Sequence, residues 1–401
     1  WTQPPVVMRG FVRSITREES IGEDGRPQRT VRISGDDYGA IAEITRISLI
    51  AMVGMGQSIL PYIRLKEMGV EGALLPACQY IDLLRVHYLN EQLQNMTVET
   101  GDIEQIKEIS YDCSVTAGIL HATRLTETQG TVWKLMMDAA DTPWNELFIE
   151  DRDPSLDNNQ SGPWLVYRPA PWKDLDGNFI TNTGQTIDAA KIRHITDQAD
   201  AGQPEFSLVR SATYQRSDDQ VNNIYWVVAR AIAFDWSLAL ANALTSQDSS
   251  VQIDHPNADI DVYGARVMQL ETTHAPEGAW RQILVASGQA DQNRETLDEW
   301  AKQRRKWLSD ANIDNVLRDD GTLVVRGNEK LRIGSYYTIT RGQFACEHYL
   351  TQVSHTFVPG REFFTHVGFI RSNNYYLRDR ERTEGKRSPF LLEGRAGVLE
   401  R

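Results

Sequence analysis

The sequence predicts a β-rich α+β fold, and three observations support that prediction. Near the start, residues 9–20 and 29–39 alternate apolar and polar side chains, as the strands of a β-hairpin do. From residue 208 onward, several runs alternate or are continuously apolar, which is typical of half-buried strands. Between these two regions apolar residues recur at helical spacing, so we expect helices there.

The hairpin comes first along the chain, with a connector at residues 21–28 that contains Gly, Asp and Pro. The apolar residues expected to share its buried faces are Phe11, Ile15, Val31 and Ile33. The arginines expected to project elsewhere are Arg13, Arg17, Arg29 and Arg32.

Three helices are expected next, over residues 37–53, 77–94 and 131–140. Asp36 or Asp37 can cap the first helix, and its periodic apolar residues are Ile41, Ile44, Leu49 and Val53. Pro143 is expected to end the third helix, whose apolar face consists of Val132, Leu135, Met136 and Ala139. The apolar run at residues 47–56 is shorter than the roughly 20 residues that span a bilayer, which favours a buried helix or an oligomer contact.

Two loops contain spaced aspartates, at residues 151–162 and 173–179. Neither has the glycine and the distal glutamate of an EF-hand, so calcium is not expected. Farther along, residues 294–312 predict an amphipathic helix with a capping box at Thr296 and Glu299. Its basic residues suit either a phosphate patch or, as we expect, a solvated face; they are Lys302, Arg304, Arg305 and Lys306.

The composition limits the classes of function. The chain has 401 residues and a net charge of −13, the opposite of what a protein that neutralises nucleic-acid phosphates needs. Moderate acidity keeps a protein soluble, and it also suits a surface past which DNA must move without binding. Cys78, Cys113 and Cys346 are odd in number and widely spaced, so we expect buried free thiols in a reducing compartment.

Motifs for enzyme chemistry are missing from the sequence. It contains no HExxH pair, no GxSxG elbow and no glycine-rich phosphate loop, so we predict no catalytic, cofactor-binding or metal-binding residues. The cluster that comes nearest to a zinc motif is Cys346, His348 and His355, whose spacing matches no common zinc site.

His355 and His366 raise the question of a shared metal site. If Pro359 and Gly360 form a two-residue hairpin turn, His355 lies opposite Phe364 and the two histidines lie diagonally on one face. L-Pro before Gly favours a type II turn, so a longer loop that shifts the pairing is an alternative. We interpret both histidines as packing residues at the edge of an aromatic core.

The order of seven segments is more informative than any single residue. They are GFVRSI…RTVRISGDDYG, TVWKLMMDAADTPWNELFIED, PWLVYRPAPW, YQRSDDQVNNIYWV, DVYGARV, LRIGSYYTI and YLTQVSHTFVPGREFFTHVGFIRSNN. Over residues 10–376 this series resembles the late control protein D family, the baseplate hub proteins of contractile-tailed phages. It is also similar to the first part of VgrG spikes in type VI secretion.

The resemblance implies two tail-tube-like β-barrel modules joined by mixed α/β segments, and three chains forming a pseudo-hexameric ring. The expected domains are 1–40 (remainder of the first barrel), 41–205 (mixed α/β connection), 206–245 with 312–372 (second barrel), 246–311 (insertion with the amphipathic helix) and 373–401 (docking tail). Family members carry several tens of residues before the first hairpin, whereas here nine precede Gly10. The first barrel is therefore either incomplete or preceded by a missing segment.

The partners that the resemblance implies are two further copies of the chain, the central spike, the tail tube or its initiator, and the tape measure protein in the lumen. DNA would pass through without specific binding, and the chain would be assembled in the host cytoplasm and reside in the virion baseplate. A VgrG-like secretion spike is the first alternative. A cell-wall glycan hydrolase is the second, because 55 acidic residues offer many carboxylate pairs.

Overall fold

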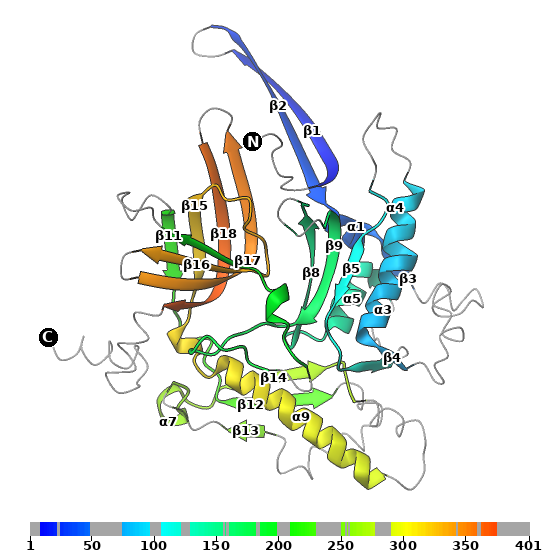
Figure 1. The fold of residues 1–401 in the computed structure, drawn as a ribbon, viewed down its shortest axis with the longest axis vertical. Coiled ribbons are helices and arrows are strands. Elements are labelled where there is room, and N and C mark those ends of the chain that lie inside the picture. Colours follow the sequence, from blue (N-terminus) through cyan, green and yellow to red (C-terminus); the bar gives the residue numbers. More distant parts are fainter. Residues whose placement is uncertain are drawn as a thin grey trace, which may run out of the picture. The chain divides into compact units, whose positions relative to one another are not determined.

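A computed structural model describes residues 9–21, 25–48, 74–96, 106–121, 129–154, 157, 160–181, 185–198, 209–229, 250–252, 255, 257–276, 290–341, 344–358 and 362–374. The predicted β-rich α+β class is confirmed (Figure 1). The chain divides into two compact units, which are described separately. Unit 1 comprises residues 1–115 and 120–168, and unit 2 comprises residues 116–119 and 169–401.

Unit 1 is a helix-rich core joined to a long β-ribbon and a small sheet. The elements that lie wholly or mostly in it are β1 (Gly10–Ile21), β2 (Pro27–Asp37), α1 (Gly39–Ile44), β3 (Arg46–Ser48), β4 (Leu74–Pro76), α3 (Ala77–Leu84), the π-helix η1 (Arg85–Asn90), α4 (Glu91–Asn95), β5 (Ser110–Cys113), β6 (Ile119–His121), β7 (Gln129–Thr131), α5 (Val132–Ala140), β8 (Asn145–Arg152) and β9 (Gly162–Pro169). Its three-stranded sheet has the order β5-β9-β8, and side chains of α1, α3 and α5 fill the core.

Two of the three predicted helices of this unit are confirmed. Residues 77–95 are continuously helical through α3, η1 and α4. In α5 the Thr131 hydroxyl caps Lys134 N at 3.2 Å, and all four predicted core residues are buried. The helix ends at Asp141, in the left-handed region at φ 60°, two residues before Pro143.

The prediction of a helix over residues 37–53 is wrong for residues 45–48. Thr45 is extended, and β3 then pairs antiparallel with β7, so strand pairing replaces the helix after its second turn. Leu49 and Val53 lie outside the described residues. Among the described helices, none combines the length and apolar character needed to cross a bilayer.

Unit 2 is organised around a six-stranded sheet. Its elements are η3 (Ala189–Lys191), β10 (His194–Gln198), β11 (Val209–Gln215), β12 (Ile224–Ala229), β13 (Ser250–Gln252), α7 (Ile260–Tyr263), β14 (Val267–Thr272), α9 (Ala290–Asn312), η6 (Asn315–Leu317), β15 (Asp319–Arg326), β16 (Tyr336–Arg341), β17 (Phe344–Val358) and β18 (Glu362–Asn374). The large sheet has the order β10-β16-β17-β18-β15-β11, and a smaller one has the order β13-β12-β14.

The large sheet buries one apolar cluster, which includes Leu323, Tyr337, Leu350, Val367 and Phe369. All its neighbouring strands are antiparallel except β10 and β16, which are parallel. In the described part of the chain β10 and β11 are its two edges and do not pair with each other, so the sheet is open there. The strand-rich pattern predicted from residue 208 onward is confirmed by β11, β12 and β15 to β18.

Helix α9 corrects two predictions. It begins at Ala290, so Thr296 lies inside the helix and the predicted capping box is wrong. Arg304 and Arg305 are buried, whereas Lys302 and Lys306 are exposed as expected of a solvated face. Arg304 lies four residues from both Trp300 and Leu308, on the buried stripe, and its guanidinium stacks 4.5 Å from the Trp300 ring.

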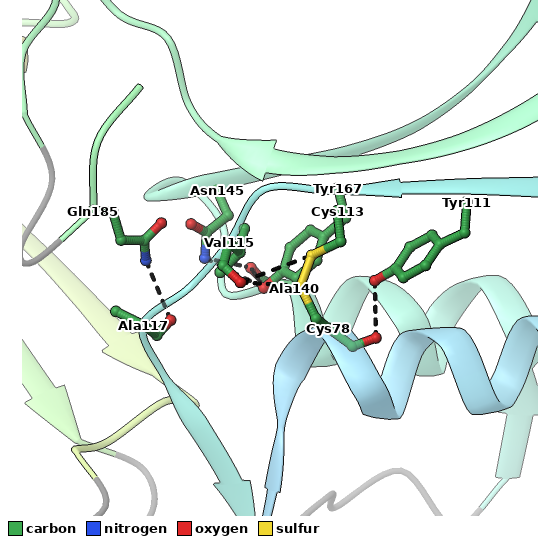
Figure 2. The surroundings of a disulfide bond; sticks show 9 residues. All are labelled: Cys78, Tyr111, Cys113, Val115, Ala117, Ala140, Asn145, Tyr167 and Gln185. Atoms are coloured by element: carbon green, nitrogen blue, oxygen red, sulfur yellow. Dashed lines mark hydrogen bonds between the residues drawn. A yellow bond between two sulfur atoms is a disulfide. The ribbon is translucent and has the colours of Figure 1, made fainter. Parts of the chain in front are cut away.

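Cys78 and Cys113 form a disulfide, which corrects the expectation of free thiols for both. Cys78 is at the start of α3 and Cys113 ends β5, and their Cα atoms are 6.1 Å apart, within the usual range (Figure 2). The Tyr111 hydroxyl donates to the Cys78 carbonyl oxygen at 2.9 Å and adds a second tie between the same elements. Cys346 is buried and lies outside this disulfide, as predicted for a buried thiol.

Reduction of this disulfide is expected to lower the free energy of unfolding. The bond spans 35 residues, so the loop-entropy model assigns it about 3–4 kcal/mol. Urea unfolding with and without reductant measures the change, and a non-reducing peptide map should contain the joined Cys78 and Cys113 peptides. Cys346→Ser should leave the effect of reductant unchanged; a map in which all three thiols react with alkylating agent contradicts the assignment.

Candidate functional site

The β17–β18 register separates the two histidines that the sequence singled out. Val358 pairs with Glu362 across residues 359–361, so the loop has three residues and the pairing shifts by one from the two-residue model. His355 lies opposite Thr365, and His366 lies opposite Ser354. Since Thr365 and His366 are adjacent, the two histidines point to opposite faces, and the predicted diagonal pair is wrong.

Each histidine has its own surroundings. His355 is half-buried; its Nδ1 is 2.9 Å from the Thr365 hydroxyl, and its ring lies 5.9 Å from that of Phe363. Burial, and then the positive charge of Arg332, lower the pKa of His355 below 6.5. His366 is exposed. Only His355 therefore has the packing role that we expected of both.

His348 is a structural histidine in the core of the sheet. Its Nδ1 is 3.1 Å from the Tyr337 carbonyl oxygen and its Nε2 is 3.2 Å from the Tyr214 hydroxyl. The imidazole ring packs edge-to-face with the ring of Phe369, and the two ring centres are 4.5 Å apart. Both ring nitrogens thus have partners within the protein, and neither is directed at an open ligand site.

A buried ion pair that sequence reasoning missed joins a loop to this sheet. Lys173 Nζ is 2.8 Å from Glu347 Oε1, with the two side chains only 10% and 9% exposed. The ammonium group also lies 4.0 Å from the ring centre of Tyr336 and 5.2 Å from that of Phe179, so aromatic faces complete its surroundings. His194 stacks on Tyr336, and burial lowers its pKa. Only the turn signal at residues 173–179 pointed to this place, because the partner is 174 residues away.

In the aspartate-containing loop at residues 151–162, the carboxylates of Asp151 and Asp157 have partners within the protein. Asp151 pairs with Arg9 at 2.6 Å, and Asp157 accepts a hydrogen bond from Asp153 N at 2.7 Å. Over the described residues, no group of three or more His, Cys, Asp or Glu side chains is placed to hold a metal ion.

Two surfaces of the chain lack a neighbouring layer among the described residues: the outer edge of β11 and the β1–β2 ribbon. Strand β11 pairs with β15 on one side only among the described strands, and every residue from Arg210 to Gln215 is exposed. The ribbon β1–β2 is exposed along nearly its whole length. The prediction that Ile15, Val31 and Ile33 are buried is wrong for this chain, because no described element covers them.

No family model matches the sequence, and no curated protein is significantly similar to it. Among solved structures, the tail protein from Neisseria meningitidis MC58 is similar, with 11% identity, a TM-score of 0.46, and coverage of 91% of this chain and 80% of that one. The 43 kDa tail protein of prophage MuSo2 from Shewanella oneidensis has 9% identity, a TM-score of 0.38 and the same coverage of each chain.

Removing the charge of Glu347 is expected to destabilise unit 2. Glu347→Gln leaves the Lys173 ammonium buried without a carboxylate, which costs about 3–5 kcal/mol. Urea unfolding of the wild type and the variant measures the loss. The double variant Lys173→Met with Glu347→Leu should recover most of it, because no buried charge remains; a single variant as stable as the wild type contradicts the role of the pair.

Acid should weaken the fold through His355. Its pKa in the folded state lies below the unfolded value of 6.5, so as pH falls below 6.5 the unfolded chain takes up a proton first and stability declines. An NMR titration is expected to place the midpoint of His355 below 6.5. Unfolding at pH 7.5 and 5.5 should show a smaller loss in His355→Gln than in the wild type, and a His355 midpoint at or above 6.5 refutes the prediction.

Proposed function

We propose that this chain is a structural component of a contractile phage tail: a baseplate hub whose homotrimer adapts the sixfold tail tube to the threefold central spike. The edge strand β11 carries the proposal, because among the described strands it pairs with β15 alone and its residues from Arg210 to Gln215 are exposed. An exposed edge strand can pair with a strand of another chain, and soluble proteins normally cover or disrupt such an edge. A ring of copies covers such edges in every protomer at once.

The seven segments of the family resemblance support the same proposal. They correspond to β1–β2, to α5 with β8, to β9, to β11 with β12, to α7 with β14, to β16 and to β17–β18. They are therefore distributed over both units rather than confined to one local motif. The proposed role is structural, without catalysis, and the central spike, the tail tube or its initiator, and the tape measure protein are the proposed neighbours.

We place the second tube-like module in residues 206–245 with 312–372, which contain strands β11 and β15 to β18 of the six-stranded sheet. The remainder of the first module is the β1–β2 ribbon, and residues 41–205 form the connection. The ring would line part of the DNA conduit. The chain carries a net charge of −13, so we expect acidic and neutral polar residues to line the lumen. Such a lining has few basic groups to displace counterions from the DNA phosphates, so DNA would pass without binding to it.

The oligomeric state tests this function. Native mass spectrometry of the purified full chain, alone and with its spike and tube proteins, is expected to detect trimers that bind both partners. A reconstruction of the tail tip should show three copies between tube and spike. A chain that stays monomeric at all concentrations and binds neither partner refutes the proposal.

A further inference from the structure

The β1–β2 ribbon gathers its apolar side chains on one face. Ile15 pairs with Ile33, and Val31 lies two residues from Ile33, so all three share this face. A bulge between Val12 and Ser14 returns Val12 to it, although Val12 and Ile15 are an odd number of residues apart. With Ile21 near the tip, five apolar side chains line one side, each 57–79% exposed.

The opposite face of the ribbon is polar. Its exposed residues are Ser14, Thr16, Glu18, Ser20 and Ser34. The Ser14 and Ser34 hydroxyls lie 2.6 Å apart and hydrogen-bond across the strands. The apolar side chains share their face with Arg17, Glu19 and Arg29, and Arg29 Nε is 3.2 Å from Glu19 Oε1. The expectation that Arg17 and Arg29 project away from the apolar residues is therefore wrong. The exposed apolar side chains of the ribbon all lie on this one face, which is typical of a sheet that packs on another layer with one side, and no described element forms that layer.

The described part of unit 1 leaves the outer half of the ribbon uncovered. The eleven paired residues of the ribbon extend about 36 Å, and the apolar side chains along it are exposed. Its base contacts α1 through β2, and Figure 1 shows the rest running away from that helix. None of the described residues of unit 1 covers the outer half, so a layer from elsewhere would complete it.

The size and charge of the ribbon favour another copy of the chain as that layer. A two-stranded face of this length offers about 350 Å², less than half of the ~800 Å² per partner in a stable interface. A closed ring adds contacts, because each protomer both presents a ribbon and receives one. Residues 10–34 contain five arginines and four acidic residues, whereas the whole chain has a net charge of −13. The ribbon is therefore not repelled by the acidic surface of a second copy.

We propose that the apolar face of β1–β2, formed by Val12, Ile15, Ile21, Val31 and Ile33, docks on a neighbouring copy of this chain. This inference rests on the proposed homotrimer and names the surface that holds it together. The polar face remains in contact with water.

Matched lysine pairs test the docking face. Ile15→Lys with Ile33→Lys and Ser14→Lys with Ser34→Lys each add two charges at neighbouring cross-strand pairs, on opposite faces. In sedimentation experiments on the full chain, the first pair should raise the dissociation constant of the oligomer at least about tenfold, and the second should leave it nearly unchanged. Circular dichroism checks that both variants remain folded.

Crosslinking identifies the occupant even if a lysine variant fails to fold. A photo-reactive phenylalanine analogue replaces Ile33 in one full-length protein and Ser34 in another. Crosslinks between chains from position 33, and few from position 34, support the inference; crosslinks within one chain, or equal crosslinking from both positions, overturn it. A wild-type trimer that persists in the Ile15 and Ile33 variant refutes this inference alone, whereas a monomeric wild type refutes the proposed homotrimer as well.

Discussion

The register of the β17–β18 hairpin is the constraint on which unit 2 depends. These two strands lie at the centre of the six-stranded sheet, with β16 and β10 on one side and β15 and β11 on the other. Side chains alternate between faces, so a slip of one residue would expose Leu350 and Val367 and bury their polar neighbours. The apolar cluster beneath the sheet thus holds the register, and the register holds every other strand in place.

Buried polar groups make the same arrangement more specific. His348 can satisfy both ring nitrogens only where Tyr337 on β16 and Tyr214 on β11 flank it, and Glu347 meets Lys173 only with β17 in this position. A shifted strand would leave these groups without partners in a medium of low polarity, which is costly. The ion pair and the histidine therefore serve the uniqueness of the fold, and no chemistry is needed to explain their burial.

Sequence periodicity identified α5 and β15 to β18, because these elements repeat apolar residues at the spacing of their secondary structure. It missed the short strands β3 to β7, which contain too few residues to show a period. It did not identify relations between distant residues. Cys78 and Cys113 form a disulfide because the fold brings them close together, and their spacing in the sequence does not show this proximity. His355 and His366 were placed on one face because a two-residue turn was assumed, and one additional loop residue separated them. The burial of Arg304 was predictable in principle, since it lies four residues from both Trp300 and Leu308.

The misjudged burial of Ile15, Val31 and Ile33 has a different physical origin. Alternation in a strand shows that one face needs an apolar neighbour, but it does not show which chain provides that neighbour. In β15 and β18 the neighbour is the chain's own core, whereas no described element covers the ribbon. On the outer side of β11 no described strand completes the backbone hydrogen bonding. The described residues leave both surfaces uncovered, and the proposed assembly with identical copies would complete each of them.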